Sequence, residues 1–86
     1  MSFRVSWDAA AEDMLTTFWL DARDRGAISD AVDEIESSMQ VDPQKLGESR
    51  AEGYRLVFLG PLVFLIQVDV VLKVVHVVDL WRVRRL

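Results

Sequence analysis

The chain has 86 residues, of which 51% are hydrophobic, and it contains two prolines, four glycines and no cysteine. A chain of this length folds around one core, so we expect a single domain over residues 1–86 with room for one site. The composition is too apolar for a disordered polymer. The absence of cysteine excludes disulfides, thiolate metal sites and cysteine nucleophiles.

The net charge of −4 conceals an asymmetry between the two halves. Residues 1–42 carry three basic side chains against ten acidic ones, whereas residues 43–86 carry seven basic side chains against four acidic ones. A domain whose whole surface grips nucleic acid is usually basic throughout. Any contact with nucleic acid is therefore expected to be local and C-terminal.

No targeting or membrane segment is expected. The N-terminus lacks the basic region followed by an apolar run that marks a signal peptide. The most apolar stretch, residues 56–80, is interrupted by polar and turn-forming residues, and its alternating β-branched residues suit a sheet better than a membrane helix. We expect a cytoplasmic protein that makes no contact with a membrane.

The N-terminal half predicts one short strand and two helices. Residues 3–7 alternate apolar and polar side chains, as a half-buried strand does, and Ser6 is placed to cap a following helix. Apolar residues then recur at helical spacing in two stripes. The first stripe comprises Ala11, Met14, Leu15, Phe18 and Trp19, and the second comprises Ile28, Ala31, Val32, Ile35 and Met39.

Polar residues 23–26 separate the two helices, which favours an antiparallel helical hairpin. Asp42-Pro43 ends the second helix, because the residue before a proline is pushed out of the α region. The acidic residues of the second helix lie opposite its apolar stripe, so we interpret them as a solvated face and not as paired catalytic carboxylates. They are Asp30, Asp33, Glu34 and Glu36.

The C-terminal half changes to strand periodicity. Residues 54–59, 62–68 and 72–81 read as three strands, with Gly60-Pro61 as the first turn. The second reversal, at residues 69–72, is rich in valine, which a tight hairpin turn disfavours, so a longer turn or a bend remains open. The predicted fold is α+β: a strand, a two-helix antiparallel hairpin and a three-stranded antiparallel meander.

Side-chain alternation divides the predicted meander into two faces. One face, with Tyr54, Leu56 and Phe58 beside the even-numbered residues 62–68, is expected to meet the helices. The opposite face then contains Arg55, Val57, Leu59, Val63, Leu65 and Gln67. Because that face is largely apolar, we expect a partner protein or a second copy of the chain to cover it. The expected contact residues are Val57, Leu59, Val63, Leu65 and Trp81.

The order of elements and the residues around the loops resemble the RelE/ParE toxins of type II toxin–antitoxin systems. The resemblance covers nearly the whole chain. It is carried by the strand ending at Trp7, Ala10 or Ala11 with Leu15, Ala31 with Ile35, Asp42-Pro43, residues 47–50, Gly53-Tyr54-Arg55, Pro61-Leu62, Val68-Asp69 and residues 78–82.

The resemblance implies a toxin that a separate antitoxin protein neutralises. In the RelE branch such a toxin cleaves mRNA in the ribosomal A site without a metal or other cofactor, and in the ParE branch it poisons DNA gyrase. RNA cleavage by a 2′-hydroxyl needs a base, an acid and cations around the phosphate.

The resemblance also assigns candidate roles to residues. Arg55 and Arg82 match basic positions of the family best, and Tyr54 and His76 are nearby candidates for acid–base chemistry. Arg50, Arg84 and Arg85 are candidate ligands of RNA phosphates. No cluster of histidine or acidic residues has the spacing of a metal site.

Two departures reduce the expected positive charge. Val57 stands where another cation is expected, and residues 62–64 read Leu-Val-Phe where many relatives have an arginine. These departures leave a second interpretation open, in which the same fold is a non-catalytic protein-interaction module.

Overall fold

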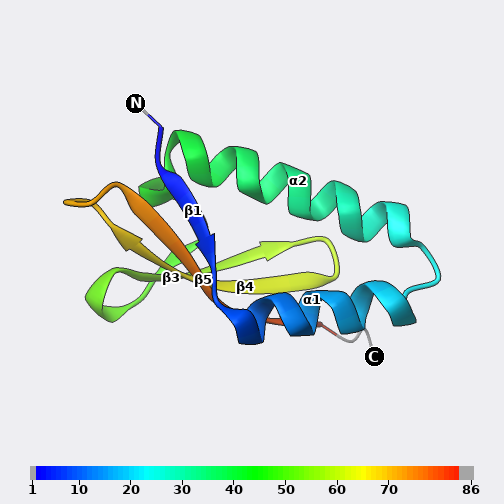
Figure 1. Ribbon diagram of the computed structural model, residues 1–86. Coiled ribbons are helices and arrows are strands. Elements are labelled where there is room, and N and C mark those ends of the chain that lie inside the picture. Colours follow the sequence, from blue (N-terminus) through cyan, green and yellow to red (C-terminus); the bar gives the residue numbers. More distant parts are fainter. Residues whose placement is uncertain (1, 84–86) are drawn as a thin grey trace.

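The computed structural model describes residues 2–83, which form one mixed sheet with two helices on one of its faces (Figure 1). In chain order the elements are β1 (Arg4–Trp7), α1 (Ala9–Asp21), α2 (Arg25–Val41), the 3₁₀ turn η1 (Pro43–Lys45), β2 (Glu48–Ser49), the 3₁₀ turn η2 (Ala51–Gly53), β3 (Tyr54–Leu59), β4 (Leu62–Asp69) and β5 (Val74–Arg82). The predicted α+β class and the order of its principal elements are confirmed.

The strands follow the order β1-β5-β4-β3-β2 across the sheet. The strands β3, β4 and β5 form the expected antiparallel meander. Strand β1 runs parallel to β5, with Val5 opposite Val75 and Trp7 opposite Val77. The last strand of the chain is therefore an inner strand of the sheet, between the first strand and β4.

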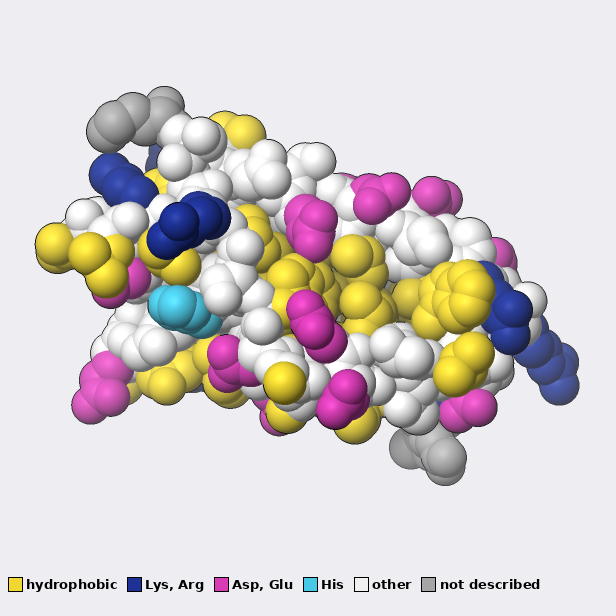
Figure 2. All heavy atoms as spheres, in the orientation of Figure 1, with side chains coloured by type: hydrophobic (Ala, Val, Ile, Leu, Met, Phe, Trp, Pro, Cys, Tyr) yellow, Lys and Arg dark blue, Asp and Glu magenta, His cyan; other side chains and the backbone are white. Residues whose placement is uncertain are grey.

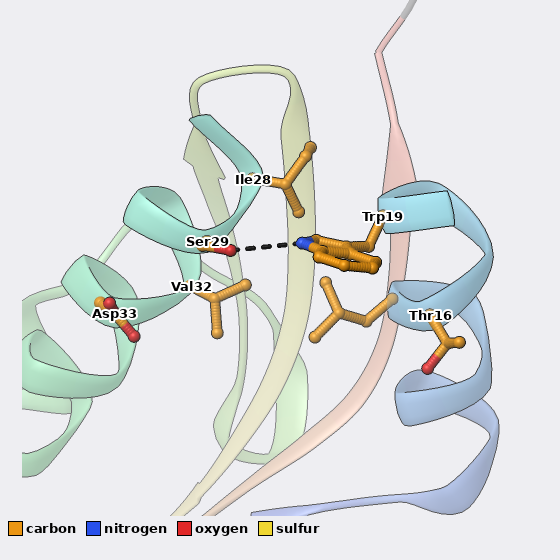
Figure 3. A pocket seen from close by; sticks show the side chains of 7 residues that line it. Thr16, Trp19, Ile28, Ser29, Val32 and Asp33 are labelled. Atoms are coloured by element: carbon orange, nitrogen blue, oxygen red, sulfur yellow. Dashed lines mark hydrogen bonds between the residues drawn. The ribbon is translucent and has the colours of Figure 1, made fainter. Parts of the chain in front are cut away.

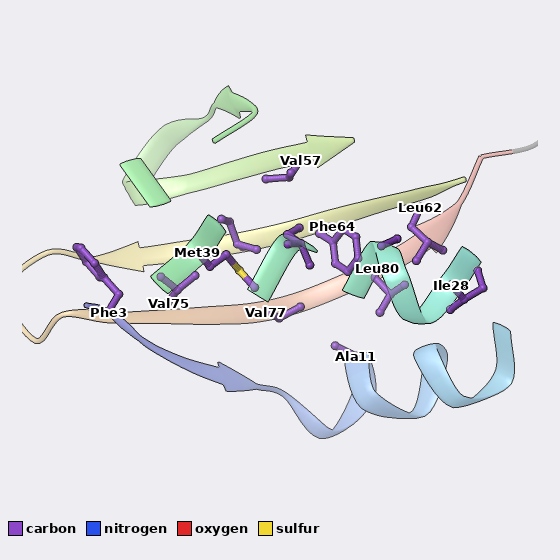
Figure 4. Close-up of a cluster of buried hydrophobic side chains, with 13 residues drawn as sticks. Phe3, Ala11, Ile28, Met39, Val57, Leu62, Phe64, Val75, Val77 and Leu80 are labelled. Carbon is purple, nitrogen blue, oxygen red and sulfur yellow. The ribbon is translucent and has the colours of Figure 1, made fainter. Parts of the chain in front are cut away.

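The core lies between the helices and the sheet (Figure 4). The stripe of α2 is confirmed, because Ile28, Ala31, Ile35 and Met39 are all buried. In α1, Ala11 is fully buried, whereas Met14 and Trp19 are exposed by 36% and 38%. Helix α1 therefore buries a narrower stripe than its sequence predicts.

The helix starts differ in how their backbone is capped. Asp8 occupies the N-cap position of α1 in place of the expected Ser6, and its side chain makes no capping hydrogen bond. Asp24 caps α2, where its carboxylate accepts a hydrogen bond of 3.0 Å from the backbone N–H of Ala27. Such a bond satisfies one of the free N–H groups in the first helical turn.

The reversal between β4 and β5 uses the longer turn that the sequence left open. It occupies residues 70–73, and the Asp69 carboxylate accepts a hydrogen bond of 2.9 Å from the backbone N–H of Leu72. Lys73 has a positive φ of 57° at the end of the turn. Val71 and Leu72 are exposed by 90% and 69%, so the tip of this hairpin is apolar.

The two faces of β3 are the reverse of those predicted: the residues expected to meet the helices point away from them, and the others point toward them. Leu59 pairs with Leu62 across the two-residue turn, so the two side chains point to the same face. Val57 pairs with Phe64 in the core, and it is only 7% exposed. Val57 and Leu59 therefore face the helices, and the expectation that they belong to an exposed partner surface was wrong.

Among residues 2–83, no helix is long and apolar enough to cross a membrane.

Candidate functional site

The sheet face away from the helices, called the open face below, is the first place where the candidate residues meet. The register of the strands puts three rows of side chains on it, each running across β3, β4 and β5. The rows are Tyr54, Gln67 and His76; Leu56, Leu65 and Asp79; and Phe58, Val63 and Trp81.

The first row is polar and contains two groups capable of proton transfer. Tyr54 and His76 each pair with Gln67, one from either side, and Ser6 of β1 extends the row beyond His76. Neighbouring strands lie about 4.8 Å apart, which separates the backbones of Tyr54 and His76 by about 10 Å. The three side chains are half-buried, and the Gln67 amide donates a 3.3 Å hydrogen bond to the Glu52 carbonyl.

The third row makes the far end of the open face apolar. Phe58 is 59% exposed and Trp81 is 39% exposed, whereas Val63 between them is 1% exposed. Leu65 of the middle row is half-buried. Leu65 and Trp81 of the predicted partner surface are thus accessible on the open face, with Phe58 in the place predicted for Val57. Val63 is on the same face but is buried, so it is not the exposed contact that was expected.

Arg55 does not lie on the open face. Its side chain is on the helix-facing side of β3, where its Nε donates a hydrogen bond to the carbonyl of Leu46 and an Nη donates to the carbonyl of Gly47 at 3.5 Å. These bonds tie the loop before β2 to β3. In this structure the side chain has a structural task, which the family position alone did not reveal.

Arg82 is also on the helix-facing side, because it pairs with the buried Leu62. Its guanidinium lies over the ring of Phe18 in α1, 5.5 Å from the ring centroid. The pairing partners of Arg55 and Arg82 are Ile66 and Leu62, four residues or about 13 Å apart along β4. The two best family matches therefore do not share a site.

Arg50 lies near Tyr54 at the end of the sheet. Both residues line a cavity of about 220 Å³ together with Arg55, Ser49 and Val68. The Arg50 guanidinium donates to the Glu48 carboxylate at 2.9 Å. The backbone N–H of Arg50 donates to the carbonyl of Tyr54 at 2.7 Å, which fixes the loop beside the phenol.

Arg84 and Arg85, the other predicted phosphate ligands, lie outside the described residues. Within residues 2–83, no group of three or more histidine, aspartate or glutamate side chains is arranged to hold a metal ion. The polar row thus offers a phenol, an amide and an imidazole, with the guanidiniums of Arg50 and Arg55 in the cavity at its edge and the Asp79 carboxylate one row away.

Two features of the site escaped the sequence analysis. Gln67 was placed on the correct face, but its position between Tyr54 and His76 depends on the strand register, which alternation alone does not fix. The second feature is a hydrogen bond between the sheet and a helix, in which the Trp7 indole of β1 donates to the Glu36 carboxylate of α2 at 2.9 Å. Glu36 had been interpreted as part of a solvated face.

Comparison with solved structures identifies the fold. No family model and no curated protein matches the chain. A chain of the chromosomal ParDE TA system from P. aeruginosa superposes with a TM-score of 0.74 at 20% identity, covering 96% of this chain and 98% of that one. A chain of the toxin–antitoxin complex RelBE2 from Mycobacterium tuberculosis gives 0.76 at 16% identity, covering 96% and 100%.

A chain of the intact E. coli RelBE toxin–antitoxin complex gives a TM-score of 0.61 at 17% identity, covering 98% of this chain and 100% of that one. All three similarities extend over nearly the full length of both superposed chains, so they concern the whole arrangement of strands and helices and not one shared motif. The chain therefore has a RelE/ParE-like fold.

Proposed function

We propose that the chain is the toxin of a type II toxin–antitoxin pair and that a cognate antitoxin protein neutralises it. The observation that carries this proposal is the full-length likeness to chains from three structures of such systems. Induced expression in a bacterial host should arrest growth. Co-expression of a small protein encoded next to this chain should restore growth and yield a stable complex with it.

For the toxic activity we propose metal-independent cleavage of mRNA on the ribosome by the polar row. The His76 imidazole takes the proton of a ribose 2′-hydroxyl, whose oxygen then forms a bond to the adjacent phosphorus. The bond from phosphorus to the 5′-oxygen breaks, and the Tyr54 phenol gives that oxygen its proton. The products are a 2′,3′-cyclic phosphate and a 5′-hydroxyl, so neither an oxidant nor a co-reactant is needed.

The geometry supports this assignment in two ways. Backbones about 10 Å apart leave room for one phosphate between the inclined side chains of Tyr54 and His76. Two donors are available for the phosphate oxygens: the second N–H of the Gln67 amide, whose first donates to Glu52, and the Arg50 guanidinium, which also bonds the Glu48 carboxylate.

Conservative variants test the row. Tyr54→Phe and His76→Gln should each slow cleavage of a translated mRNA at least about 100-fold, the usual contribution of one acid or base. Asp79→Asn is the matched control, because Asp79 is on the same face but outside the row. Full cleavage by both row variants would refute the mechanism, whereas growth arrest without any cleavage would leave the toxin assignment standing and exclude the nuclease.

A second candidate function has its own support. Arg55 and Arg82, the cations expected beside the scissile phosphate, face the helices, and the open face ends in exposed Phe58 and Trp81. Such an apolar surface with few cations suits a protein target better than RNA. On this interpretation the chain is a non-catalytic interaction module or a gyrase-directed toxin.

The two candidates respond differently to substitution at the apolar end. Phe58→Ser with Trp81→Ser should abolish binding of a protein target while Tyr54→Phe leaves it intact. If the polar row cleaves RNA, Tyr54→Phe should abolish cleavage and the double variant Phe58→Ser with Trp81→Ser should leave it intact. Purified gyrase inhibited by the chain in a supercoiling assay would favour the second candidate directly.

A further inference from the structure

A groove on the opposite side of the molecule is independent of the open face. It lies between α1 and α2, has a volume of about 330 Å³, and is lined by Leu15, Thr16, Trp19, Ile28, Ser29, Val32 and Asp33. Figure 3 shows Trp19, Ile28 and Val32 converging from the two helices, and Leu15 lines the same groove. The floor of the groove is therefore apolar, and it is open to solvent.

Trp19 fixes one end of this groove. Its indole N–H donates to the Ser29 hydroxyl at 3.3 Å, which bridges the two helices. The Arg25 guanidinium lies 4.4 Å from the centroid of the indole and donates to the carbonyls of Trp19 and Leu20. The indole is held in place from both sides, yet 38% of it remains exposed. A preformed apolar surface of this kind loses little conformational freedom on binding.

The rim of the groove is acidic. Asp33 lines it directly, Glu12 lies one turn before Thr16 on the same side of α1, and Glu36 follows Asp33 on the same side of α2. Together α1 and α2 contain seven acidic residues and a single basic one, Arg25, which is already engaged with Trp19. Figure 2 shows an apolar run between the helices with acidic side chains on both sides of it.

We propose that this groove binds an amphipathic segment of a partner protein that presents aliphatic side chains flanked by lysine or arginine. The aliphatic side chains fill the space above Leu15, Ile28 and Val32, and the basic side chains meet the carboxylates of the rim. A second copy of the chain fits poorly, because pairing two identical acidic helix faces would bring like charges together.

The probe is a synthetic helical peptide of roughly 14 residues, with leucines at positions i, i+3, i+4 and i+7 and lysine elsewhere. A matched peptide carries glutamate in place of every lysine. Titration into the isotope-labelled full chain should shift the amide signals of Leu15 and Val32 and the indole signal of Trp19. The glutamate peptide should bind at least ten-fold more weakly.

Charge-matched variants separate the groove from general attraction to an acidic protein. Asp33→Lys and Glu12→Lys alter the rim and should each weaken binding of the lysine peptide about ten-fold. Glu34→Lys and Asp13→Lys change the net charge equally, but each lies one residue, about 100° around its helix, from the rim carboxylate it is matched to, outside the lining of the groove, and should change binding less than three-fold. Circular dichroism of each variant checks the fold.

Several results would overturn the proposal. These are equal losses in rim and control variants, equal binding of the glutamate peptide, no binding at millimolar peptide, and self-association of the chain through the groove. None of these results bears on growth arrest, which tests the toxin assignment separately.

Discussion

Gly47 offers a sharp test of how the loop beside the candidate site is built. Its φ is +58°, and a Cβ atom added there would lie 1.9 Å from the carbonyl oxygen of Leu56. Gly60 has nearly the same φ, +59°, but a Cβ atom there would meet nothing within 4 Å. The two glycines thus share a backbone conformation and differ only in the space around them, so alanine at each position isolates the effect of close approach.

The expected magnitudes follow from these two environments. An alanine held in the left-handed region costs about 1 to 2 kcal/mol, and this term applies equally to Gly47→Ala and Gly60→Ala. At Gly47 the strand β2 must also move away from β3, which gives up backbone hydrogen bonds worth about 1 kcal/mol each. We therefore expect Gly47→Ala to lower the free energy of unfolding by about 2 kcal/mol more than Gly60→Ala does.

Urea unfolding followed by far-UV circular dichroism measures both variants under identical conditions. A chain of this size has a total stability of about 5 to 13 kcal/mol, so both proteins should still fold. The reasoning would be refuted by a difference between the variants below about 0.5 kcal/mol. Since the Gly47 carbonyl meets the Arg55 guanidinium, which lies outside the polar row, growth arrest should persist with both variants wherever they are folded.

Three further predictions concern single side chains. Arg55→Lys removes the forked hydrogen bonds to Leu46 and Gly47, so it should lower the free energy of unfolding by about 1 to 2 kcal/mol. RNA cleavage should persist wherever this variant is folded. Loss of cleavage in a fully folded variant would make Arg55 a catalytic candidate again. Trp7→Phe removes the hydrogen bond to the Glu36 carboxylate and should cost about 1.5 kcal/mol in chemical denaturation, whereas Trp81→Phe on the open face should cost less than half as much. Asp24→Ala removes the cap of α2 and should lower the free energy of unfolding by about 1 kcal/mol. The control Asp21→Ala, at the end of α1, should leave the free energy of unfolding unchanged or raise it. An equal loss in both variants would contradict the capping role.

The elements were predictable because their patterns are local. The stripe of Ile28, Ala31, Ile35 and Met39 repeats at three and four residues, and all four side chains are buried. The Gly60-Pro61 turn can likewise be predicted from the residues next to it in the sequence. The parallel pairing of β1 with β5 has no such local signal, because it joins Arg4 to Val74 across almost the whole chain.

The candidate site was only partly predictable, and the reason is register. A two-residue turn makes Leu59 and Leu62 direct partners, which sends Arg55 and Val57 toward the helices. The prediction fixed the alternation within each strand but not the pairing between strands, so one residue of slip exchanged the faces of β3. Family position suggests a catalytic role for Arg55, and the structure adds a contact that no sequence pattern predicted, the bonds from its guanidinium to the carbonyls of Leu46 and Gly47.

A bulge added a second uncertainty in β5. The register shifts between Leu65 and Ile66, so that Val77 and Leu80 both reach the core although they are three residues apart. Simple alternation from His76 would have placed Leu80 on the open face. The same irregularity brings Asp79 and Trp81 to the open face, next to Leu65 and Val63.

The inner position of β5 has a consequence for synthesis of the chain. Strand β1 is made first, but among residues 2–83 it pairs with β5, the last of these strands to be made. Until residues 74–82 have left the ribosome, the nascent chain has a hairpin of β3 and β4 and a helical pair but no continuous sheet, and the polar row lacks His76. The polar row and the apolar end of the open face are therefore completed in one step, when β5 joins β4.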